Sequence, residues 1–98
     1  MNSKERWCFA DMVWHALFEK DIDWLRRRIK EADGDMREAL LTLHEILSVD
    51  IVEMFFVTKN KLETDLSLTG VEKEVYELVH KVCKKELDRA ASLAKSKK

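Results

Sequence analysis

The chain has 98 residues, 46% of them hydrophobic, with a formal net charge of −1, which fits one folded domain spanning residues 1–98 and excludes a disordered chain. It lacks proline and has only two glycines, so an all-α fold is predicted. The charge does not favour nucleic-acid binding, no apolar run reaches the ~18 residues of a membrane span, and no signal-peptide pattern is present; a cytoplasmic protein is expected.

The first predicted helix covers residues 3–32, with Ser3 as its expected N-cap, and contains an unusually apolar segment at residues 7–18. At about 100° per residue, the apolar side chains fall on several sides of that segment. One seam contains Trp7, Trp14, Phe18, Ile22, Leu25, Ile29 and Ala32, and a second contains Ala10, Val13, Leu17 and Trp24. A helix that is apolar all round must be covered by other protein.

A short chain of three helices offers too little surface to cover every side of residues 7–18, so we expect an oligomer, with a dimer favoured, or a protein partner. The alternative is that the loop after the second helix folds back over this end. Trp24 lies among charged neighbours and is the preferred anchor, whereas Trp7 and Trp14 fit a core equally well. The expected interface residues are Trp7, Val13, Trp14, Leu17 and Trp24.

The second predicted helix follows a tight link at residues 33–35, in which Gly34 suits a left-handed conformation and Asp35 an N-cap. So short a link predicts antiparallel neighbours. The apolar stripe of this helix runs from Met36 to Val57 and is interrupted by Asp50. Asp50 and Glu53 have the spacing of a fresh cap, so residues 51–58 either continue the helix or form a separate short one.

A long loop is predicted at residues 59–69, held to the bundle by Leu62, Leu66 and Leu68. The third helix is expected to start at Thr69 and to fade into a frayed tail after residue 93. Residues 81–98 contain seven basic and two acidic side chains, which suits a helix C-terminus and alternatively forms a docking patch for an acidic partner. The predicted fold is an antiparallel bundle of three long helices, or four if the second breaks at Asp50.

Three polar residues suggest a buried site. His15 and Asp11 share a helix face one turn apart, and Asp50 lies in an apolar stripe, where a carboxylate is costly unless paired. We interpret Asp11, His15 and Asp50 as an ion pair or cap that fixes register, with a metal-binding bundle as the alternative. Glu77 and His80 form a lone E-x-x-H half-motif that is expected to face solvent.

Arg37 and His44 provide the one enzyme alternative. Their spacing matches the loose R-x4–6-H pattern of HEPN-type helical ribonucleases, which are all-helical dimers, but one such spacing is expected by chance and Glu38 stands where that family shows a small polar residue. The pattern therefore does not indicate membership. It defines a helical ribonuclease or RNA-associated subunit as the alternative.

The remaining sequence features favour binding over catalysis. Cys8 and Cys83 have no metal-ligand spacing and are expected to be free thiols, and the chain has no phosphate-binding loop or nucleophile elbow. We therefore predict a protein–protein interaction or assembly subunit without catalytic activity of its own, with no cofactor and no metal.

Overall fold

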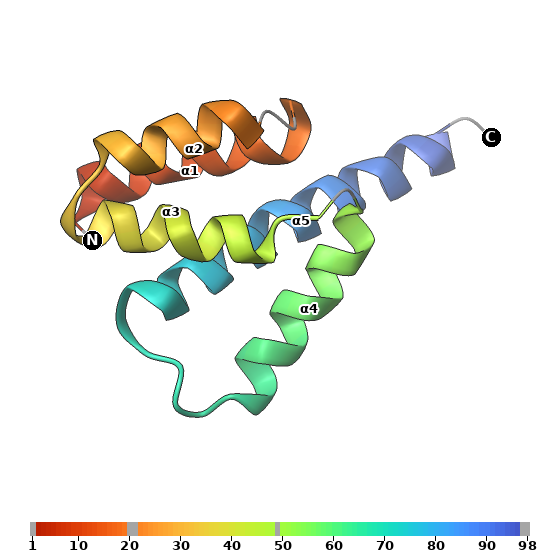
Figure 1. The fold of residues 1–98 in the computed structure, drawn as a ribbon. Helices are drawn as coiled ribbons and strands as arrows, with labels where there is room; N and C mark the ends of the chain where they lie inside the picture. Colours follow the sequence, from red (N-terminus) through yellow and green to blue (C-terminus); the bar gives the residue numbers. More distant parts are fainter. Residues whose placement is uncertain (1, 20–21, 49, 97–98) are drawn as a thin grey trace.

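The computed structural model describes residues 2–19, 22–48 and 50–96. Within these ranges the chain forms five helices and no strand, as Figure 1 shows: α1 (Ser3–Glu19), α2 (Ile22–Glu31), α3 (Gly34–Ile46), α4 (Ile51–Thr64) and α5 (Gly70–Ser96). The all-α prediction is confirmed. The end of the expected tail, residues 97–98, lies outside the described residues.

The long helix α5 organises the molecule, because α4, α3 and α1 all pack against it (Figure 1). Helix α2 packs on α3 and lies beside α1, where the rings of Trp24 and His15 stack with centroids 4.0 Å apart. The core draws side chains from all five helices. Its fully buried members include Phe9, Val13, Leu17, Leu25, Leu40, Leu43, Met54, Val75, Val79 and Cys83.

The prediction of one helix over residues 3–32 is wrong, because α1 ends at Glu19 and α2 begins at Ile22; the link at residues 20–21 lies outside the described residues. A straight helix of that length would extend about 45 Å and carry its second half away from the core. The break instead brings Leu25 into the core with no exposed surface. Asp23, in the first turn of α2, favours a helix start through the macrodipole.

The start of α1 differs from the prediction by one residue, because Asn2 rather than Ser3 occupies the N-cap position. The Glu5 backbone N–H donates to Asn2 Oδ1 at 2.9 Å, and the Asn2 N–H donates to Glu5 Oε1 at 3.3 Å. This reciprocal pair is a capping box. At the next link, Gly34 has φ +57°, the predicted left-handed conformation, and Asp33 rather than Asp35 is the N-cap of α3.

The sequence left open whether the second helix continues through Asp50 or breaks there, and the structure has the break, with α4 beginning at Ile51. Asp50 is the N-cap of α4, and its Oδ1 accepts a hydrogen bond from the Val52 backbone N–H at 2.9 Å. Ser48 Oγ also donates to Glu53 Oε2 at 3.2 Å, at the position expected for a fresh cap. The side chain of Asp50 is exposed, so the expectation of a buried carboxylate at this position is wrong. A capping carboxylate needs no burial, because its partner is the backbone two residues on.

The long loop predicted for residues 59–69 is wrong in its first half, because α4 continues to Thr64. Leu62 is half-buried and extends the buried face of Met54 and Thr58 by one turn, which favours helix over loop. In the remaining loop Leu68 is buried, as predicted, but Leu66 is 93% exposed and anchors nothing within the described chain.

Asp65 closes α4 and shapes the loop that follows. Lys61 Nζ lies 2.8 Å from its Oδ2, and Ser67 donates to its Oδ1 through the side-chain hydroxyl at 2.6 Å and the backbone N–H at 3.1 Å. The hydrogen bond from Lys61, followed by those from Ser67, lowers the pKa of Asp65 to about 2.

Candidate interaction surface

Helix α1 divides its apolar side chains between the core and the outside. Phe9, Val13 and Leu17 are fully buried, whereas Trp7 is 76% exposed and Trp14 is 52% exposed. The two tryptophans are seven residues apart, which places them about two turns apart on the same face. The described chain therefore leaves about three quarters of Trp7 and about half of Trp14 open to solvent. The alternative in which a loop folds back to seal this end is therefore wrong.

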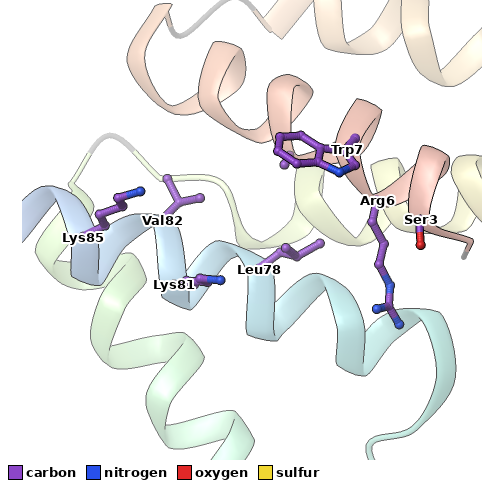
Figure 2. Close-up of a pocket in the computed structure, with 8 residues that line it drawn as sticks. Ser3, Arg6, Trp7, Leu78, Lys81, Val82 and Lys85 are labelled. Carbon is purple, nitrogen blue, oxygen red and sulfur yellow. The ribbon is translucent and has the colours of Figure 1, made fainter.

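The exposed tryptophans line a groove between α1 and α5, which we call the α1/α5 groove. Figure 2 shows its first part, where Trp7 projects from α1 toward α5, on which Leu78 and Val82 lie opposite. This hollow has a volume of about 420 Å³, and an adjoining one of about 680 Å³ extends along the same two helices past Trp14. Both hollows share Trp7 and Val82, so they form one continuous groove.

The two helices run in the same direction along the groove. At one end Arg6 of α1 is paired with Glu74 of α5, with Nη2 and Oε1 2.7 Å apart, and at the other end Trp14 lies with Asp88. We call these the Arg6 end and the Trp14 end. The ion pair lowers the pKa of Glu74 through the hydrogen bond from Arg6. The pair joins α1 to α5 at the Arg6 end of the groove.

Charged side chains are distributed unevenly along the groove. Lys81 and Lys85 line the hollow at the Arg6 end, and Asp11 and Asp88 line the hollow at the Trp14 end, where Lys85 also reaches. Within the described residues, none of these four side chains has a hydrogen-bond or ion-pair partner. By contrast, Arg89 at the Trp14 end is paired with its neighbour Glu86 at 2.8 Å. The groove therefore has an apolar floor, with Lys81 at one end, Asp11 and Asp88 at the other, and Lys85 between them.

The structure places the five predicted interface residues in three environments. Trp7 and Trp14 line the groove, whereas Val13 and Leu17 are buried core residues on a neighbouring face of α1 and present no surface to a partner. Trp24 is half-buried, stacks on His15, and has the Arg28 guanidinium 5.4 Å from its ring centroid. The expected preference for Trp24 over Trp7 and Trp14 as the exposed anchor is therefore reversed.

The residues of the predicted polar site are not brought together. Asp11 is exposed in the groove, and Asp50 caps α4 as described above. His15 Nδ1 lies 3.2 Å from Glu19 Oε2, and its Nε2 is buried with no hydrogen-bond partner. Among the residues that the structure describes, no group of three His, Cys, Asp or Glu side chains is placed to share a metal ion.

The other two histidines, His44 and His80, do not line the α1/α5 groove. His80, predicted to face solvent, is half-buried against α4: its Nδ1 lies 3.1 Å from Thr58 Oγ1, and its ring stacks on Phe55 with centroids 4.7 Å apart. Thr58 Oγ1 also lies 2.8 Å from the Met54 carbonyl oxygen and 3.0 Å from that of Phe55. Arg37 and His44 are exposed on α3, and neither lines the α1/α5 groove.

The sequence analysis missed the α5 side of the groove. Leu78 and Val82 lie half-buried on α5 beside Trp7. The only signal in the sequence is that the apolar stripe of this helix extends farther than a chain of this length can cover.

Comparison with protein-family models, with curated proteins and with solved structures gives no match for this chain. None of the described helices combines the length and apolarity that crossing a membrane requires. Within the described residues, the fold is all-helical and exposes an apolar groove between α1 and α5.

Proposed function

We propose that this protein is an assembly subunit: a helical bundle that associates with a second copy of itself through the α1/α5 groove, without catalytic activity of its own. The observation that carries the proposal is the exposure of Trp7 and Trp14 on a helix whose other side lies in the core. Two exposed indoles side by side in a groove are typical of a binding surface rather than of an ordinary monomer surface.

The exposed indole surface is large enough to support association. A whole tryptophan side chain has roughly 250 Å² of surface, so about 190 Å² of Trp7 and about 130 Å² of Trp14 face solvent. At about 25 cal/mol per Å², covering both would contribute up to about 8 kcal/mol per protomer before the cost of association. A dimer counts this contribution twice, which supports an affinity in the micromolar range or tighter.

The dimensions of the groove also fit a macromolecular partner. Its adjoining hollows extend over three turns of α1, from Ser3 to Trp14, or about 16 Å. Bundles commonly bury an amphipathic helix in such a slot between two helices. A second copy offers a suitable helix, because its α1 has the same two exposed tryptophans.

The proposal is tested by sedimentation velocity of the wild-type chain and of Trp7→Glu and Trp14→Glu. We expect the wild type to shift from monomer to dimer with rising concentration and both variants to remain monomeric, with unchanged far-UV circular dichroism. Phe56→Glu is the matched control, because Phe56 is 58% exposed on α4 and does not line the groove. A wild type that stays monomeric, or Trp variants that still dimerise, would refute the proposal.

A further inference from the structure

The arrangement of charge along the α1/α5 groove indicates how two copies meet, an inference that rests on the proposed function. Lys81 lines only the hollow at the Arg6 end, Asp11 and Asp88 line only the hollow at the Trp14 end, and Lys85 lines both. These four side chains have no partner within the described residues. The lysines would therefore gain most from a partner surface that offers carboxylates, and the aspartates from one that offers cations.

The groove is complementary to itself when one copy is reversed. Placing two grooves face to face in the same direction would set lysines against lysines and aspartates against aspartates. Reversing one of them sets each lysine end against the aspartate end of the other copy. A reversed pairing of identical surfaces is the geometry of a two-fold axis, the commonest symmetry of soluble oligomers.

The spacing of the tryptophans agrees with this arrangement. Trp7 and Trp14 are about 10 Å apart along α1, and Lys81 and Asp88 are about 10 Å apart along α5, because each pair is separated by seven residues. Trp7 lines both hollows and therefore lies near the middle of the groove, close to where a two-fold axis would pass. Each Trp14 would then lie over the other copy's 420 Å³ hollow, where Arg6 and Lys81 offer cations to an indole face.

We propose that two copies of this chain pair groove to groove about a two-fold axis, with the Lys81 end of each groove against the Asp11 and Asp88 end of the other. Lys85, which lines both hollows, lies between the two ends. An acidic peptide would match only the lysines and would meet repulsion from the aspartates, and a basic peptide would do the reverse. A second copy satisfies both ends at once.

The test is a charge exchange between two variants. The first carries Lys81→Glu and Lys85→Glu, so its groove is acidic at both ends, and the second carries Asp11→Lys and Asp88→Lys, so its groove is basic at both ends. We expect each variant alone to self-associate at least tenfold more weakly than the wild type, because like charges face each other. An equimolar mixture is expected to form a 1:1 heterodimer with an affinity near that of the wild type, weakened by added salt.

The controls separate this inference from the proposed function. A chain with Lys59→Glu and Lys73→Glu has the same change in net charge outside the groove, and it is expected to dimerise like the wild type. If each charge variant dimerises normally alone, or if the two fail to combine when mixed, the two-fold charge pairing is refuted. The proposed function is then still tested separately by whether Trp14→Glu remains monomeric. A monomeric wild type overturns both.

Discussion

The exposure of one side of α1 predicts effects of very different size for two nearly adjacent aromatic substitutions on the stability of the monomer. Phe9 has no exposed surface, and Trp7, two residues earlier, is 76% exposed. Phe9→Ala removes a core side chain and leaves a cavity, which costs about 3–5 kcal/mol. Trp7→Ala loses at most the covered quarter of an indole, roughly 60 Å², or about 1.5 kcal/mol at about 25 cal/mol per Å².

The free energy of unfolding is measured by urea titration with far-UV circular dichroism, at concentrations where the chain is monomeric. Domains of this size are stable by about 5–15 kcal/mol, so Phe9→Ala is expected to approach complete unfolding at the low end of that range. In thermal scans it should lower the midpoint by at least about 12 °C, from about 4–8 °C per kcal/mol. A loss of more than about 2 kcal/mol for Trp7→Ala in the monomer would mean that this indole is packed inside, and the reasoning would fail.

Three further predictions follow from local contacts. Asp50→Ala removes the cap of α4 and is expected to lower the free energy of unfolding in urea by about 1 kcal/mol. Asp50→Ser should be close to the wild type, because serine also caps helices. Equal stability of all three chains would contradict the capping role of Asp50. Hydrogen bonds from Lys61 and then Ser67 lower the folded-state pKa of Asp65 from 3.8 to about 2, so the stabilising contribution of this carboxylate is complete above pH 3.8 and lost as the pH falls through about 2. Asp65→Asn should remove that part of the pH dependence of unfolding, and an unchanged profile would count against the pairing. Cys83 is buried, which raises its pKa to about 11, whereas Cys8 is exposed. A thiol reagent at neutral pH should therefore label one thiol per native chain, and none in the Cys8→Ser variant. Labelling of two thiols per native chain would refute this prediction.

Features encoded by neighbouring residues could be predicted from the sequence. The break at Asp50 was predictable because its carboxylate bonds the backbone only two residues away, at Val52. The left-handed backbone conformation of Gly34 was also predictable, because glycine has no side chain to oppose it. The separation of α1 from α2 could not be read in the same way, because the apolar pattern continues across it and the gain lies in tertiary burial of Leu25.

The candidate site was predictable only in part. Composition showed that residues 7–18 have more apolar surface than this chain can cover, and Trp7 and Trp14 are indeed exposed. Periodicity identified two apolar seams on this helix but could not show which of them faces the core. Val13 and Leu17 were therefore predicted to be interface residues together with Trp7 and Trp14. The α5 side of the groove depends on an ion pair between Arg6 and Glu74, 68 residues apart, which no local pattern encodes.

The central claim is that the α1/α5 groove joins two copies of this chain, and the molar mass of the unmodified protein in solution tests it most directly. Light scattering over a concentration series from sub-micromolar upward is expected to show a mass rising from 11.6 kDa toward twice that value, with no larger species, because a two-fold pairing uses both grooves. A mass that stays at 11.6 kDa throughout the series would contradict the account.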